Sequence, residues 1–178
     1  MARISLIDEE QHPELAPLVA RMRGARRGSL INIYRMLLHS APIAERWFEH
    51  LNAVRWGTGL DGALREIVII RVGLLNRVDY VWQAHVPKLA LAEGLTLEQC
   101  DALRDWQPSG VFSEAQRAAL AYTDAMTLDV AVPDGVFADV KTHYDERRIV
   151  ELTVLIGTYN MHTRVLAALR IDPEPAAG

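Results

Sequence analysis

The chain has 178 residues, of which half are apolar and 24% are charged. This composition excludes an intrinsically disordered chain, and the length predicts one domain with a well-filled core. Nineteen basic residues against 23 acidic ones give a net charge of −4, so no basic surface for nucleic acid is indicated. We therefore expect a globular protein without a nucleic-acid partner.

Cysteine content and hydropathy favour the cytoplasm. Cys100 is the one cysteine and cannot form an internal disulfide, which is typical of a reducing compartment. The sequence contains no uncharged apolar run of about 18 residues, the length that a membrane span needs. The N-terminal segment is acidic where a signal peptide would be apolar. We expect a soluble cytoplasmic protein that does not bind membranes.

Apolar residues recur with helical rather than alternating period along almost the whole chain, which predicts an all-α fold. Asp61, Thr96 and Ser113 are suited to cap helix starts, and a capping box begins at Thr96. Pro42 is expected in the first turn of a helix, and Pro87 is expected to kink or split one. The predicted helices span residues 14–23, 32–40, 44–57, 63–76, 79–94, 97–104, 114–128, 134–144 and 145–169.

The helix at 63–76 is the most apolar, because residues 67–70 and 72–75 are all apolar or glycine. The β-branched run at 67–70 could also form a strand, but its length and its helical flanks favour a helix. A helix that is apolar nearly all round is buried on every side. One small domain does not readily cover so many apolar faces, so we expect a homo-oligomer.

Residues 61–77 resemble residues 145–161 within the same chain. At one fixed offset the two segments match in a capping Asp, a Gly and an Asn: Asp61 with Asp145, Gly73 with Gly157, and Asn76 with Asn160. Two apolar helices can match this well by chance. The sequence therefore leaves an internal helical repeat and a chance similarity equally open.

Glu66 and His85 are the main candidates for chemistry. The turn between their two helices centres near Asn76, ten residues after Glu66 and nine before His85. If the helices pair antiparallel, the two side chains reach the same level and can meet. A carboxylate that orients an imidazole is the usual arrangement of a tuned general acid/base. The alternative is a Glu at a helix start and a core His satisfied by a backbone carbonyl.

Other polar residues are weaker candidates. Arg71 lies in the apolar helix and needs a partner, either a structural ion pair, a neighbouring subunit or a substrate carboxylate. Tyr80 and Trp82 flank the helix face of His85 and belong either to the core or to a ring-binding site. Arg164 belongs to a polar group in the last helix that either caps a pocket or contacts another subunit: Tyr159, Asn160, His162 and Arg164.

No metal or cofactor site is predicted. The sequence has no HExxH motif, no cysteine cluster and no pair of histidines four residues apart. The glycines at 57–59 lack the lysine of a phosphate-binding loop. Cys100 falls on an amphipathic helix between Gln99 and Asp101, where an activated thiolate is not expected.

The segment 64–96, LREIVIIRVGLLNRVDYVWQAHVPKLALAEGLT, resembles the core of the carboxymuconolactone decarboxylase/AhpD-like alkylhydroperoxidase superfamily. The resemblance extends over about residues 30–170. It implies an AhpD-like helical domain that spans 1–178 with residues 1–29 as an N-terminal extension. The residues that carry it lie on the apolar helix, in the turn and on the following helix: Glu66, Asn76, Asp79, Tyr80, Trp82 and His85.

The resemblance also identifies the branch. The peroxidase branch has Cys-x-x-Cys at the positions of Val78 and Val81, whereas Glu66 and His85 match the family's proton-relay pair. Because a thiolate is the nucleophile in peroxide reduction, thiol peroxidase activity is disfavoured here. The decarboxylase branch similarly lacks the cysteines and keeps the acidic residue and the His.

The resemblance to that branch implies a cofactor-free lyase that acts on a small carboxylated lactone or related ring acid, as in the catabolism of aromatic compounds. Glu66 and His85 are then catalytic, Tyr80 or Trp82 shapes the ring site, and Arg71 or Arg164 binds the substrate carboxylate. One alternative is an isomerase, hydratase or aldolase-type proton transfer with the same pair. Another is a non-catalytic oligomeric binding protein. The resemblance further implies a homotrimer or a hexamer.

Overall fold

The computed structural model describes residues 1–25 and 29–174, and over these residues it contains helices and no strand. The all-α prediction is confirmed. The α-helices are α1 (Ala16–Gly24), α2 (Asn32–Leu37), α3 (Ala41–Trp56), α4 (Gly62–Leu75), α5 (Asp79–His85), α6 (Leu97–Ala102), α7 (Glu114–Leu128), α8 (Asp134–His143) and α9 (Glu146–Leu169). Within the described ranges, no helix combines the length and the apolarity that crossing a bilayer requires.

The predicted helix signals act as expected. The Asp61 side chain accepts a hydrogen bond from the Leu64 amide at the start of α4. Capping boxes start α6 at Thr96 and α7 at Ser113. Pro87 splits the predicted helix at 79–94, because α5 ends at His85 and a π-helical turn follows at Val86–Ala90.

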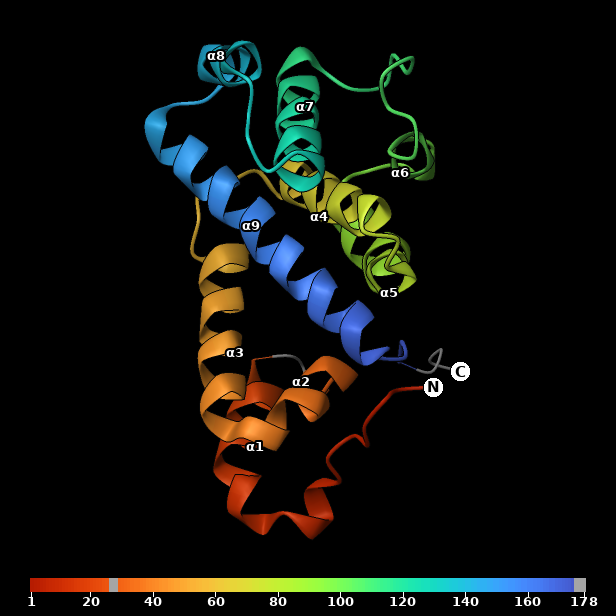
Figure 1. The fold of residues 1–178 in the computed structure, drawn as a ribbon, viewed down its shortest axis with the longest axis vertical. Coiled ribbons are helices and arrows are strands. Elements are labelled where there is room, and N and C mark those ends of the chain that lie inside the picture. The colour runs from red at the N-terminus through yellow and green to blue at the C-terminus, as the bar shows by residue number, and fades with distance from the viewer. Residues whose placement is uncertain (26–28, 175–178) are drawn as a thin grey trace.

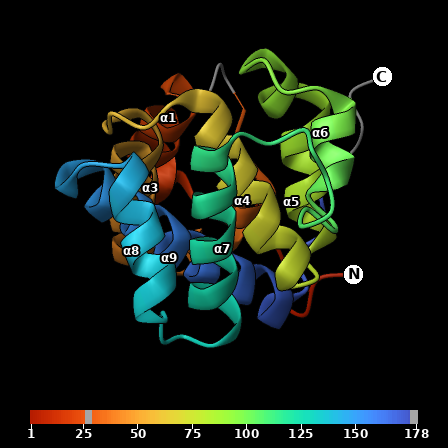
Figure 2. The ribbon, with the colours of Figure 1, turned by 90° about the horizontal axis from the view of Figure 1, so that it is seen from above.

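Helix α4 forms the centre of the fold. Every residue from Leu64 to Gly73 is buried, and α4 packs against α5, α7 and α9. Figure 1 shows α9 running diagonally along the molecule, and Figure 2 shows α7 lying next to α4 between the α8/α9 side and the α5/α6 side. The β-branched run at 67–70 is helical, as its length and its helical flanks predicted.

Helices α4 and α5 approach closely at a glycine. A Cβ atom built at Gly73 would lie 2.7 Å from the Cβ of Val81, closer than side chains pack. Gly73 therefore lets the two helices lie together, two turns along α4 from Glu66. The same packing brings the end of α5, which carries His85, alongside the start of α4.

Candidate active site

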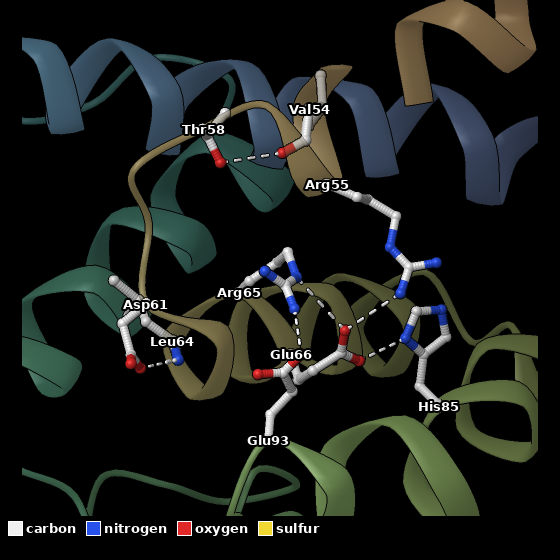
Figure 3. Close-up of polar contacts among 9 residues, drawn as sticks. All are labelled: Val54, Arg55, Thr58, Asp61, Leu64, Arg65, Glu66, His85 and Glu93. Atoms are coloured by element: carbon white, nitrogen blue, oxygen red, sulfur yellow. Dashed lines mark hydrogen bonds and ion pairs between the residues drawn. The ribbon is translucent and has the colours of Figure 1, made fainter. Parts of the chain in front are cut away.

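Glu66 and His85 are in direct contact. His85 Nδ1 lies 2.6 Å from Glu66 Oε2, and the two side chains come from the neighbouring helices α4 and α5 (Figure 3). Glu66 is fully buried and His85 is 7% exposed. The antiparallel pairing expected from the sequence thus brings the two groups to the same level. A buried carboxylate at this distance holds the imidazole in one orientation and leaves Nε2 for other contacts.

Two buried arginines face the same carboxylate. Arg55 extends from α3 and places Nη2 at 3.4 Å from Glu66 Oε1, and Arg65 Nε lies 3.7 Å from that oxygen. Arg65 also reaches Glu93 through Nη2 at 2.6 Å. Figure 3 shows both guanidinium groups pointing toward Glu66. One Glu66 oxygen therefore meets His85, and the other meets two cations.

These neighbours set the charge of Glu66. Burial raises the pKa of a carboxyl, but the hydrogen bond from His85 and the charges of His85, Arg55 and Arg65 outweigh it and lower the pKa of Glu66. Glu66 is consequently a carboxylate at neutral pH. An ionised Glu66 stabilises the positive form of the His85 imidazole.

A row of aromatic rings connects His85 to α3 through α9. The Tyr159 ring lies edge-on to the His85 ring with centroids 5.9 Å apart, and the His162 ring follows at 5.6 Å from Tyr159. Trp47 Nε1 then donates to His162 Nδ1 at 3.3 Å. Tyr159 thus packs against His85, and His162 packs against Tyr159. Both residues belong to the polar group predicted in the last helix.

The two arginines proposed for the substrate carboxylate lie in other contacts. Arg71 donates to both carboxylate oxygens of Asp124, at 2.6 and 2.7 Å, and to the Leu103 carbonyl at 2.8 Å. It therefore ties α4 to α7 as a structural ion pair, the alternative that the sequence left open. Arg164 is exposed and donates to the backbone and side-chain oxygens of Asn160. The structure does not bring either arginine to Glu66 and His85.

Tyr80 and Trp82 also make their contacts away from the pair. The Tyr80 hydroxyl donates to Glu174 at 2.7 Å, near the C-terminal end of the described chain. The Trp82 ring lies 4.1 Å from the Arg104 guanidinium carbon. Trp82 also lines a cavity of about 320 Å³ beside the α4–α5 turn. A ring-binding role for Trp82 would therefore involve this cavity.

Arg55 and Arg65 were missed by the sequence-based predictions. Arg55 has a recognisable signal, since it follows Leu51 by four residues on the apolar stripe of α3, and a charged residue there needs a buried partner. Trp56, next in the chain, is 59% exposed rather than part of the core. Its ring centroid lies 4.8 Å from the guanidinium carbon of each of these two arginines.

The cysteine positions of the peroxidase branch hold buried hydrocarbon. Val78 and Val81 are 8% and 2% exposed. Cys100 is buried elsewhere, and its burial, together with the charges of Asp101 and Glu66, raises the pKa of its thiol. Among residues 1–25 and 29–174, no cluster of three or more His, Cys, Asp or Glu side chains is arranged to hold a metal ion.

The family model for the carboxymuconolactone decarboxylase family matches residues 41–125, the segment that contains Arg55, Arg65, Glu66 and His85. Over this segment the chain is similar to the carboxymuconolactone decarboxylase family. The resemblance found in the sequence is thereby confirmed. The family and its structural neighbours include enzymes.

Two uncharacterised bacterial proteins are similar in sequence. YnjA of Escherichia coli is 30% identical over 116 residues, which span 65% of this chain and 63% of that protein. YdfG of Bacillus subtilis is 28% identical over 114 residues, which span 63% of this chain and 77% of that protein.

Solved structures share the fold. A protein of unknown function from Agrobacterium tumefaciens, for which an AhpD-type antioxidant defence role has been suggested, is 25% identical with a TM-score of 0.74, covering 79% of this chain and 96% of its own. A variant of the debrominase Bmp8, in complex with 2,3,4-tribromopyrrole, is 19% identical with a TM-score of 0.81, covering 99% and 95%. These likenesses support the AhpD-like fold.

Proposed function

We propose that this protein is a cofactor-free lyase that removes CO2 from a small carboxylated lactone or related ring acid. Glu66 and His85 serve as its proton relay. The observation that carries the proposal is the 2.6 Å contact between Glu66 Oε2 and His85 Nδ1 in a buried site. A carboxylate and an imidazole in this arrangement supply a positioned proton donor without any cofactor.

The chemistry follows from what decarboxylation leaves behind. The bond between the carboxylate and the ring carbon breaks, CO2 departs, and the electron pair stays on carbon as an enolate conjugated with the ring carbonyl. His85 Nε2 donates a proton to that carbon, and the neutral imidazole regains a proton from water. Glu66 remains ionised throughout and holds the Nδ1–H, which fixes the ring and stabilises its charged form.

Burial supports the same reaction. A carboxylate that enters a dry site loses its hydration, whereas the neutral CO2 that leaves has little hydration to lose. Within the site, hydrogen bonds and charges act with less screening than in water. The buried surroundings of Glu66 therefore favour transfer of the negative charge from the compact carboxylate to the delocalised enolate.

The same pair supports a second candidate, an isomerase, hydratase or aldolase-type enzyme that moves a proton without releasing CO2. A non-catalytic binding protein is a third. The deciding experiment incubates the chain with carboxymuconolactone, follows the ring absorbance and measures CO2. Loss of the ring signal with one CO2 per turnover supports the lyase. A ring change without CO2 supports the second candidate. The absence of both a ring change and CO2 contradicts both enzyme candidates.

We further propose that the chain forms a homo-oligomer, as a trimer or a hexamer. An apolar groove of about 520 Å³ lies between α3 and α9, lined by residues that include Ile43, Trp47 and Met161. Ile43 is 53% exposed and Met161 is 40% exposed. Exposed apolar side chains gathered on one face are typical of contacts between subunits.

A further inference from the structure

Two buried nitrogens beside Glu66 have no hydrogen-bond partner among the described residues: Nε of Arg55 and Nε of Arg65. Each arginine is only 6% exposed, so neither nitrogen is solvated as a surface group would be. Leaving a buried N–H of a charged group unpaired costs on the order of 1–3 kcal/mol or more. Native proteins leave few such groups, and one explanation for them is a ligand that completes the site.

Of the two arginines, Arg55 has the weaker hydrogen bonding to the nearby carboxylates. Glu66 gives one oxygen to His85 at 2.6 Å, and its other oxygen lies 3.4 Å from Arg55 Nη2, which is longer than a typical N–H···O bond. Glu93 is bound to Arg65 at 2.6 Å, so it serves that guanidinium instead. Among the described residues, the buried Arg55 guanidinium thus has one long hydrogen bond to a carboxylate and an Nε–H without a hydrogen-bond partner.

The chemistry of the guanidinium group indicates which kind of ligand would bind beside Arg55. A guanidinium presents its N–H groups as a planar fork that matches the two oxygens of a carboxylate. The Trp56 ring lies against both guanidinium carbons and is itself more than half exposed. The arginine pair is therefore next to an exposed aromatic surface, which suits a ligand that joins a planar ring to a carboxylate.

We propose that Arg55, supported by Arg65, binds the carboxylate of a small ring acid next to His85. The inference rests on the proposed function for the identity of the ligand, and it replaces Arg71 and Arg164 as candidates for that role. Arg55 holds the carboxylate through Nε and Nη atoms, Arg65 adds a second positive charge, and the ring of the ligand extends toward Trp56.

The test uses the whole chain labelled with 15N-arginine and observes the Nε–H resonances during titration with benzoate. Benzamide, an uncharged molecule of the same shape, is the matched ligand control. We expect the resonances of Arg55 and Arg65 to move saturably with benzoate, and at least about tenfold more benzamide to be needed for any effect, because the guanidinium fork selects for charge. Resonances of Arg55 that do not respond to benzoate would overturn the proposal.

Single lysine variants assign the signals and measure the contribution of the fork. Arg55→Lys keeps the charge but loses the planar donors, and we expect it to weaken benzoate binding by at least about tenfold. Arg46→Lys is the matched control, since Arg46 lies on the same helix, is exposed and pairs with Glu49. Equal binding by the two variants would contradict the role of Arg55. If Arg55→Lys does not fold, through-bond correlation to the backbone assigns the Arg55 Nε–H signal, and the wild-type titration still decides.

The carboxylate site at Arg55 and the lyase activity can be disproved independently of each other. If benzoate moves the Arg55 resonance but carboxymuconolactone is not consumed, the carboxylate site stands and the lyase does not. If carboxymuconolactone is consumed and Arg55→Lys leaves KM unchanged, the lyase stands and the carboxylate site does not.

Discussion

Asn76 and Asn160, which occupy equivalent places in the two similar segments of the sequence, are hydrogen-bonded to each other. Asn76 Nδ2 donates to Asn160 Oδ1 at 3.0 Å and also to the Thr163 hydroxyl at 2.9 Å. The matching residues Asp61 and Asp145 both cap helix starts, of α4 and α9 respectively. The pattern that suggested a repeat thus includes residues that join α4 to α9.

We expect Asn76→Ala and Asn160→Ala each to destabilise the fold by about 1–3 kcal/mol, because each leaves partly buried polar partners unsatisfied. In the double variant the shared bond is lost only once. The two losses should therefore sum to more than the loss in the double variant, by about 1 kcal/mol. Urea unfolding of the three variants measures this difference, and strictly additive losses would show that the bond contributes nothing.

The Glu66–His85 pair should act as one unit in turnover. We expect His85→Gln and Glu66→Gln each to lower turnover by about 10²–10⁴-fold, the usual contribution of general acid–base catalysis. The double variant should lose little more than either single one, since residues that act together are non-additive. Turnover and melting temperature are measured on all three. A lower melting temperature with activity per folded molecule retained would indicate a structural pair instead.

Peroxide reduction with a dithiol reductant should be absent. Val78 and Val81 offer no thiolate, and the buried Cys100 has a thiol pKa raised by burial. Peroxide consumption is measured on the wild type and on Cys100→Ser. Thiol-dependent activity that disappears in the Cys100→Ser variant would prove this prediction wrong.

Alkali should destabilise the protein through Tyr144. Burial, followed by the charge of Asp61, raises the pKa of Tyr144 from 10.0 to about 12, and its hydroxyl donates to the Ala115 carbonyl. Below pH 10 the folded and unfolded states both keep this proton, so the contribution is complete. Between pH 10 and 12 only the unfolded state loses it, and stability falls as pH rises.

The measurement is the free energy of unfolding at pH 9, 10 and 11. Tyr144→Phe is the control, because it cannot ionise at this position. We expect the wild type to lose stability more steeply than Tyr144→Phe over this interval. Parallel pH profiles would contradict the role of Tyr144.

Light scattering should give a mass that is a multiple of 19.9 kDa, with a trimer or hexamer expected. We expect Met161→Glu, which places a charge in the groove between α3 and α9, to lower that mass. Val130→Glu is the matched control, because Val130 is 80% exposed and outside the residues that line the groove. A wild-type monomer at micromolar concentration would rule the assembly out.

The meeting of Glu66 and His85 could be predicted because it depends on one short turn. Residues equally far from the turn at Asn76 necessarily lie at the same level of an antiparallel pair. The helical class was equally accessible, since caps and periodicity are local properties. Even the effect of Pro87 could be foreseen from its missing N–H.

The position of Arg55 could not be predicted in the same way. It reaches Glu66 from α3, and α3 and α4 both pack against α9, an arrangement that local sequence signals do not specify. The ion pair of Arg71 with Asp124 similarly joins residues 53 positions apart. For such residues the sequence indicated that a partner was needed, but not which one.

The close approach at Gly73 sets the spacing of the α4 and α5 backbones independently of which side chain position 81 holds. The nearest atom to a side chain at position 73 would be the Cβ of Val81, which every residue except glycine also has. Exchanging Val81 for a smaller residue would remove the contacts of its Cγ atoms, but the 2.7 Å contact with its Cβ would remain for every residue except glycine. A side chain at 73 would therefore still push α5, and with it His85, away from Glu66. Position 81 is thus free to hold a hydrocarbon or a thiol on an unchanged backbone. One fold can then host either type of reactivity, as long as position 73 has no side chain.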